Sequence, residues 1–224
     1  IGRQHFQTET DNSFLVNQTD LTGKLNTWGL LHTFNIGLEA SQETRDQRRA
    51  NLCTATSLAC RTNLWSPNEI SDNGTYAWND PNATRATTVA VYASDQIKIN
   101  EYFELMGSIR YDDFRTTYTD YSQPVAMRDQ SRSDGLTSWR VGGVFHPTKN
   151  SSVYAAYGVS YNPSAEFGTL STSPTSTANV LLAPEKNNTI EVGAKVDVLN
   201  NRLSLTGAIF RIEKTNLRIP TDPI

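Results

Sequence analysis

Hydrophobic and polar residues alternate with a period of two along much of this chain. In residues 190–198 apolar side chains occupy every second position, and polar or charged side chains stand between them. Because successive side chains of a β-strand point to opposite faces, this pattern predicts a strand with one apolar and one polar face. Related patterns predict further strands. The full set is residues 13–26, 33–40, 88–99, 103–112, 138–146, 152–161, 190–198 and 203–209. Polar residues make the pattern weakest in residues 13–26.

The connections between these strands alternate between short and long. Tight turns are expected near residues 26–29, 99–101, 147–150 and 199–202, and long polar loops near residues 41–86, 113–135 and 162–186. A soluble β-sandwich has little reason to place all of its loop length at one end of its strands. A barrel in the bacterial outer membrane does, because its periplasmic turns are short and its extracellular loops are long.

Strand patterns alone do not separate a membrane barrel from a soluble sandwich, since both have one apolar and one polar face. Glycines recur inside the predicted strands, where curvature or close packing would require them. Aromatic residues fall near strand ends, as in the girdles of a barrel: Phe103, Tyr111, Trp139, Phe145 and Tyr157. The sequence therefore predicts an all-β fold, an antiparallel transmembrane β-barrel segment whose apolar faces contact lipid and whose polar faces border a wet interior.

Composition excludes several classes of function. The net charge of −3 gives no basic field for nucleic acid, and no run of about eighteen apolar residues predicts a membrane-spanning helix. The sequence contains no nucleophile elbow, zinc-protease motif or phosphate-binding loop. No metal site is expected, because His5, His32 and His146 lie far apart in the sequence and far from the cysteines.

The two cysteines, Cys53 and Cys60, lie in the longest predicted loop with six residues between them. A disulfide that closes a short loop fits an oxidising compartment such as the periplasm or the cell surface. The alternative is a pair of free thiols in a cytosolic protein. The loop context favours the disulfide.

The long loops hold the predicted recognition surface, because binding residues concentrate on loops carried by a rigid scaffold. Aromatic and arginine side chains together suit a planar, anionic ligand; the alternative is that each aromatic only packs the loops together. The run at residues 43–49 is interpreted as a solvated strand extension or the start of a loop. The candidate ligand contacts are Trp65, Tyr76, Trp78, Arg85, Tyr118, Tyr121, Arg128, Arg132 and Phe167.

Several stretches carry a resemblance to a known family. Residues 152–163, SVYAAYGVSYNP, resemble a strand of the TonB-dependent siderophore receptors. Residues 182–195, LAPEKNNTIEVGAK, resemble that family's "PEK…E-x-G-x-K" strand. Residues 91–98 and 107–112 resemble two adjoining strands of the same barrel, whereas the first sixty residues match in pattern more than in motif.

The resemblance implies roughly eight strands of a twenty-two-stranded barrel, with residues 1–224 as a partial barrel domain that lacks the N-terminal plug and the C-terminal strands. Family members bind a ferric siderophore outside the cell and import it with energy from the TonB complex, which acts through the plug. Iron would then enter only as part of the ligand, with no other cofactor, and outer-membrane lipid would surround the barrel. Charged lumenal residues would contact the plug: Arg110, Asp112, Arg140, Glu191 and Lys195.

Three other functions remain open at this point. A passive porin-type channel would share the barrel but would lack a plug. A soluble carbohydrate-binding β-sandwich at the cell surface would share the strand pattern. An outer-membrane enzyme is the least favoured, because no nucleophile and base stand at a plausible spacing.

Overall fold

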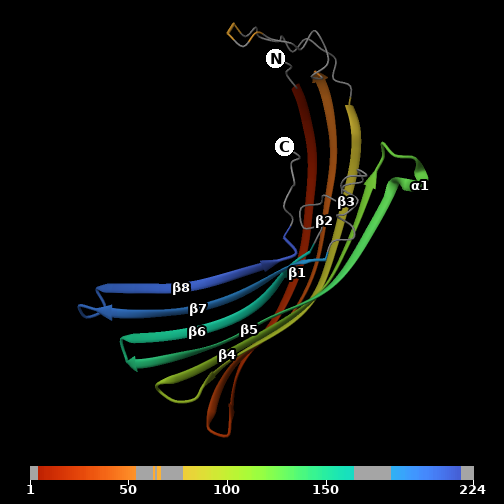
Figure 1. Ribbon diagram of the computed structural model, residues 1–224. Helices are drawn as coiled ribbons and strands as arrows, with labels where there is room; N and C mark the ends of the chain where they lie inside the picture. The colour runs from red at the N-terminus through yellow and green to blue at the C-terminus, as the bar shows by residue number, and fades with distance from the viewer. Residues whose placement is uncertain (1–4, 54–62, 64, 67–77, 164–182, 218–224) are drawn as a thin grey trace.

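The computed structural model describes residues 5–53, 63, 65–66, 78–163 and 183–217. These residues form a single curved sheet of eight strands and one short helix (Figure 1). The strands are β1 (His5–Thr27), β2 (Leu30–Cys53), β3 (Trp78–Lys98), β4 (Phe103–Asp120), β5 (Asp129–Thr148), β6 (Ser151–Asn162), β7 (Glu185–Val198) and β8 (Leu203–Thr215); the helix α1 is Val125–Arg128.

Each strand pairs antiparallel with the next one along the chain, in the order β1 to β8. Tight turns connect β1 to β2, β3 to β4, β5 to β6 and β7 to β8, which confirms the four short connections predicted from the sequence. In the first of these turns Gly29 has a φ of 84°, a conformation that costs glycine little. Within the described ranges, no helix has the length and hydrophobicity needed to cross a bilayer.

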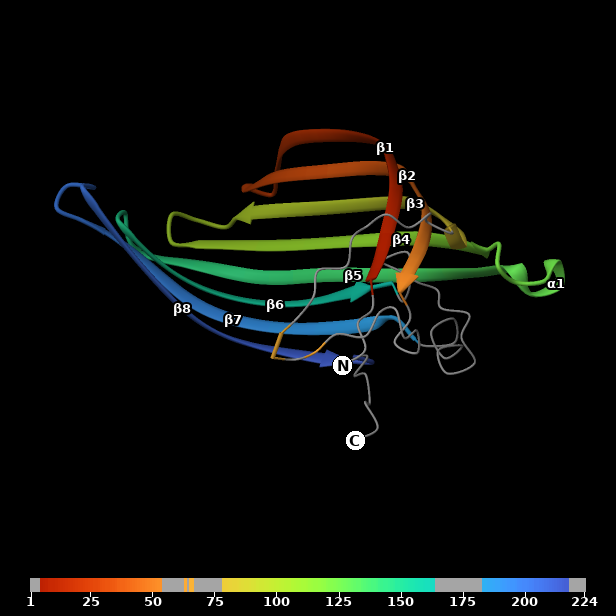
Figure 2. The same ribbon diagram turned by 90° about the horizontal axis from the view of Figure 1, so that it is seen from above.

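The register divides the sheet into one polar and one apolar face. Tyr92 of β3 lies opposite Arg110 of β4, and Arg110 lies opposite Ser138 of β5, so these polar residues share a face. That face is concave. β1 and β7 are far apart in the order of the sheet, yet Gln18 of β1 and Glu191 of β7 line the same cavity on this face. The curvature across the eight strands is visible in Figure 2.

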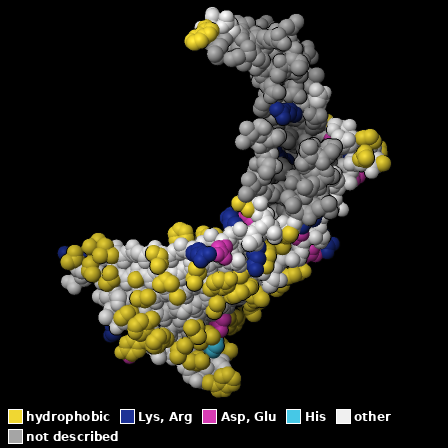
Figure 3. All heavy atoms as spheres, viewed as in Figure 1, with side chains coloured by type: hydrophobic (Ala, Val, Ile, Leu, Met, Phe, Trp, Pro, Cys, Tyr) yellow, Lys and Arg dark blue, Asp and Glu magenta, His cyan; other side chains and the backbone are white. Residues whose placement is uncertain are grey.

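The opposite, outer face carries the apolar side chains. Ile190 and Val192 of β7 are 51% and 42% exposed, and only four hydrophobic residues among those described are buried. Figure 3 shows hydrophobic side chains spread over the turn-bearing part of the sheet that faces the viewer. The predicted orientation is therefore confirmed, and a sandwich with a dry centre between two layers is excluded for the described residues.

Two of the predicted long loops are shorter than expected. The connection predicted at residues 41–86 lies between β2 and β3 at residues 54–77, and the one predicted at 113–135 lies between β4 and β5 at 121–128. The third, at residues 163–184, agrees closely with the prediction. Past the part of each strand that carries apolar side chains on its outer face, both faces are polar. The period-two pattern therefore ends there, although the backbone hydrogen bonds between the strands continue, and the strands are longer than the pattern predicts.

Candidate lumenal site

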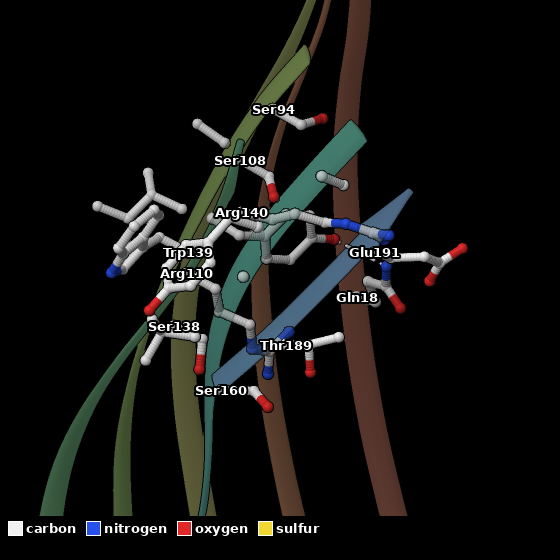
Figure 4. Close-up of a pocket in the computed structure, with 17 residues that line it drawn as sticks. Gln18, Ser94, Ser108, Arg110, Ser138, Trp139, Arg140, Ser160, Thr189 and Glu191 are labelled. Carbon is white, nitrogen blue, oxygen red and sulfur yellow. Dashed lines mark hydrogen bonds between the residues drawn. The ribbon is translucent and has the colours of Figure 1, made fainter. Parts of the chain in front are cut away.

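The concave face contains a cavity of about 580 Å³, lined by residues of β3 to β7 and by Gln18 of β1 (Figure 4). Its floor consists of small hydroxyl-bearing residues, one from each of five neighbouring strands: Ser94, Ser108, Ser138, Ser160 and Thr189. Larger polar side chains rise around this floor, among them Arg110 and Arg140. The small floor residues leave room above the backbone, and the surrounding side chains supply charge and hydrogen bonds.

A hydrogen-bonded group centred on Tyr92 borders one side of the cavity. The Tyr92 hydroxyl donates to Asp20 Oδ1 at 2.6 Å and accepts from Gln18 Nε2 at 2.7 Å. The ring of Tyr92 lies over Gly37, its cross-strand partner, where any Cβ would collide with it. A glycine beneath an aromatic ring lets the ring lie flat on the sheet and helps to pin the register.

Arg110 is held between two carboxylates. Its Nη1 and Nη2 donate to Glu39 at 3.0 and 3.1 Å, and its Nε donates to Asp112 Oδ1 at 2.8 Å. The guanidinium carbon also lies 5.5 Å from the centre of the Tyr92 ring. Planar guanidinium groups suit such two-pronged pairing, so this arginine is fixed in orientation and its charge is largely neutralised.

Arg140 differs from Arg110 because it has no ion-pair partner within the described ranges. It lies opposite Ser108 and Gly158 on the concave face, and its side chain is exposed. On β7, Glu191 accepts a hydrogen bond from the Tyr154 hydroxyl, and Lys195 pairs with Asp197 at 3.4 Å. All five residues predicted to be lumenal thus lie on the concave face; their contact with a plug stays a prediction.

The predicted ligand contacts fall into three groups. Tyr76 and Phe167 lie outside the described residues, as does the predicted disulfide, because neither Cys60 nor the side chain of Cys53 is among the parts that the structure describes. Trp65 is described and is 91% exposed. Tyr121 and Arg128 lie in the connection between β4 and β5, with the guanidinium carbon 5.3 Å from the ring centre.

The remaining candidates lie in strands, which corrects their predicted placement in loops. Trp78 begins β3, with the guanidinium of Arg48 packed 4.5 Å from its ring centre. Tyr118 and Arg132 lie on β4 and β5 and share the concave face. Arg85, in contrast, lies on the outer face opposite Thr117 of β4 and points away from the lumen. The sequence missed this because polar side chains cover both faces of the extended strands.

Sequence reasoning also missed several residues that build the lumenal wall. Asp20, Glu39, Tyr92 and Tyr154 each hold a neighbour on the concave face. Each of these residues is an odd number of positions from the outward-facing apolar residues of its strand. That spacing places it on the opposite, lumenal face, and it was the signal available in the sequence.

Among the described residues, no group of three or more histidine, cysteine, aspartate or glutamate side chains could hold a metal ion.

Comparison with known proteins agrees with this geometry. The TonB dependent receptor-like, beta-barrel family matches residues 2–223, so the chain belongs to that family, whose members are receptors of the outer membrane of Gram-negative bacteria. The chain is 32% identical to the catecholate siderophore receptor Fiu of Escherichia coli K12 over 93% of its own length and 30% of that protein. It is 33% identical to the probable TonB-dependent siderophore receptor PiuA of Acinetobacter baumannii over 96% of its length and 31% of that protein.

Solved structures agree on the fold. The closed form of the ferric-catecholate import receptor Fiu from E. coli K12 matches with a TM-score of 0.79 and 28% identity, covering 92% of this chain and 32% of that one. The siderophore receptor PiuA of A. baumannii matches with a TM-score of 0.76 and 26% identity, covering 91% and 32%. The chain therefore spans about a third of the length of the relatives that it matches.

Proposed function

We propose that this chain forms part of the barrel wall of a receptor that imports ferric siderophores, with catecholate siderophores as the first candidates. The observation that supports this most directly is the match of 93% of the chain to a catecholate siderophore receptor. The continuous polar wall on the concave face, with its charged groups and cavity, suits a lumen through which a hydrophilic cargo passes.

The proposal assigns two roles to the described side chains. Aromatic and arginine residues at the loop end, among them Trp65, Tyr118, Tyr121, Arg128 and Arg132, would contact a planar, net-negative ferric chelate. Trp78, Tyr76 and Phe167 remain candidates for the same role. Arg85 would not share this role, because it lies on the outer face.

The lumenal residues would face a plug segment in the complete receptor, through which the TonB complex would act. Arg110, Asp112, Glu191 and Lys195 already have partners on the wall, so they would present an ordered surface in which carboxylates outnumber cations. Arg140 would present an unpaired positive charge. A carboxylate of the plug opposite Arg140 would satisfy that charge.

The experiment uses the full-length receptor expressed in a Gram-negative strain that lacks its own catecholate receptors. We expect uptake of radioactive iron complexed by a catecholate siderophore, and little uptake when a hydroxamate siderophore carries the iron. The matched control is the same receptor in a strain without TonB, where uptake should stop. Uptake that persists without TonB would instead identify a passive channel, and uptake of neither chelate would reject the siderophore assignment.

A further inference from the structure

The outer face carries an ionisable pair within its apolar surface. His32 of β2 and Asp95 of β3 are joined by a hydrogen bond of 2.7 Å between Nδ1 and Oδ2. Asp95 lies opposite Phe34 on one side and opposite Gly107 of β4 on the other, so it shares the face of the apolar side chains. Its side chain is 37% exposed, so part of it is accessible from the outer face although Oδ1 itself is buried.

The pair lies close to the short-turn end of the sheet. His32 is two residues from the start of β2 at Leu30, and Asp95 is three residues from the end of β3 at Lys98. At about 3.3 Å per residue, both lie within about 10 Å of the turns along the strand. Short turns of outer-membrane barrels are periplasmic. The pair therefore lies where lipid headgroups of the periplasmic leaflet meet their acyl chains.

A groove on the outer face adjoins the pair. It is an open depression of about 560 Å³, and its lining includes Phe34, Ala93, Asp95, Gly107, Ile109 and Trp139. Ser94, Ser108 and Arg140 also line it, but the register places their side chains on the concave face. Its floor is low at Gly107, where an added Cβ would meet nothing within 4 Å. The groove is therefore a mostly apolar depression with one carboxylate, in a region that would otherwise offer only hydrocarbon contacts.

The carboxylate of Asp95 is only half satisfied. Oδ2 is hydrogen-bonded to His32, whereas Oδ1 is screened from water and has no hydrogen-bond partner in the described part of the chain. A carboxylate at the border of hydrocarbon is costly unless a donor, preferably a cation, pairs with it. Oδ1 is buried, so such a donor would approach the part of the Asp95 carboxylate that is exposed, and the lipid molecules that cover this face are the available source of it.

We propose that the groove is a binding site for a phospholipid of the periplasmic leaflet whose headgroup ends in a primary ammonium, such as phosphatidylethanolamine. The ammonium donates to the Asp95 carboxylate, which His32 orients, and an acyl chain lies over Ala93 and Gly107. The headgroup selectivity follows from charge and donors. A trimethylammonium has no N–H to donate, and a headgroup that carries only negative charge is repelled by Asp95.

The test is native mass spectrometry of the full-length receptor in detergent, with phosphatidylethanolamine, phosphatidylcholine and phosphatidylglycerol of identical acyl chains added in equal amounts. We expect phosphatidylethanolamine to be retained about tenfold more than phosphatidylcholine, as a charge-assisted hydrogen bond predicts. In Asp95→Asn, which keeps the shape but removes the charge, that preference should fall to about threefold or less. Equal retention of all three lipids by the unmodified receptor would refute the proposal.

Two glycine variants separate the groove from the rest of the outer face. Gly107→Leu fills the floor and should remove the retained phosphatidylethanolamine. Gly207→Leu is the matched control, because Gly207 of β8 lies on the same face and also has nothing within 4 Å of an added Cβ. Heat-modifiable migration on gels verifies that each variant folds, and Gly107→Ala replaces the leucine variant if that one does not.

Two results would overturn the assignment of the groove. One is an equal loss of lipid in the Gly107 and Gly207 variants, which would show that the lipid has no defined position. The other is a receptor dimer that Asp95→Asn dissociates without any change in lipid preference. That outcome would assign the His32–Asp95 pair to a contact between two copies of the receptor.

Discussion

At the scale of single residues, glycines beneath aromatic rings recur across the sheet. In each case a Cβ added to the glycine would lie within 3.0 Å of a ring atom or hydroxyl of a residue on the neighbouring strand. In such a pair the aromatic ring packs over the glycine, which has no side chain of its own to make contacts. A shifted pairing of the two strands would lose this contact, so the pair favours the observed register. The pairs are Gly23 with Phe34, Gly37 with Tyr92, Gly135 with Tyr111, and Gly193 with Tyr154.

The Gly193 pair gives a direct test of this role. In Gly193→Ala the new methyl group would lie 2.5 Å from the ring of Tyr154, which must then release its hydrogen bond to Glu191. We expect the full-length receptor to lose about 1–3 kcal/mol in its free energy of unfolding, measured by urea titration in lipid vesicles. Gly207→Ala, with open space around its Cβ, is the control. Equal losses in the two variants would show that the ring does not need the glycine.

Arg110 should contribute more to stability than a surface arginine. Arg110→Ala leaves Glu39 and Asp112 facing each other without a cation, and their side chains are 22% and 17% exposed. Allowing for screening by lumenal water, we expect a loss of about 1–2 kcal/mol in the free energy of unfolding.

The matched control for Arg110 is Arg115, which forms an ion pair with Asp113 but is 70% exposed. Arg115→Ala should cost clearly less stability than Arg110→Ala, because water and salt screen an exposed ion pair. Arg110→Lys should recover only part of the loss, because an ammonium cannot reproduce the two-pronged contact with Glu39. If Arg115→Ala were as harmful as Arg110→Ala, the lumenal network would have no special role.

At the scale of strands, the sequence predicted the membrane part of the sheet well and its extracellular part poorly. Within the membrane one face must be apolar, so β7 shows a clear period of two and its predicted end at residue 198 is the observed one, although the strand begins at Glu185, five residues before the predicted start. Beyond the membrane nothing requires that contrast. Residues 43–49 are polar on both faces and belong to β2, although the sequence left open whether they were strand or loop.

The lipid-facing assignment of β7 predicts very different costs for two substitutions that lie three residues apart. Val192→Arg places a charge on the outer face near the middle of the strand and should cost about 2–4 kcal/mol in the free energy of folding into lipid vesicles. Lys195→Gln, on the concave face, should cost much less, since Lys195 is exposed and its ion pair with Asp197 is weak at the water-filled side. Similar costs would mean that the two faces do not differ in their contact with lipid.

The extension of β2 and β3 beyond the apolar belt is also testable. Thr44 and Arg85 are direct cross-strand partners on the outer face, and paired Cα atoms in antiparallel strands lie within the range that a disulfide spans. In a receptor whose Cys53 and Cys60 are replaced by serine, Thr44→Cys with Arg85→Cys should form a disulfide, detected by a thiol-reactive mass label. Thr44→Cys with Thr84→Cys is the control and should stay reduced, because their side chains point to opposite faces.

At the scale of the whole molecule, the candidate site was less predictable than the fold. Arg110 and Asp112 could be placed on a lumenal face because alternation along one strand is local. Glu39 could not be paired with Arg110 in advance, since the two are 71 residues apart and meet only through the register of three strands. The cavity also depends on the register between strands. Its floor is made of small residues from five strands, and the sequence of any one of these strands does not reveal a cavity.

The order of the strands predicts how residues 1–224 behave by themselves. β1 and β8 each pair on one side only, so the sheet has two edges with unpaired backbone N–H and C=O groups. In hydrocarbon each unpaired group costs several kcal/mol, and only a closed barrel removes every edge. We therefore expect these residues, refolded alone in detergent, to self-associate through their edges and to show no heat-modifiable migration, whereas the full-length receptor shows it. A monomer with heat-modifiable migration would mean that β1 pairs with β8 and that eight strands are enough to close this wall.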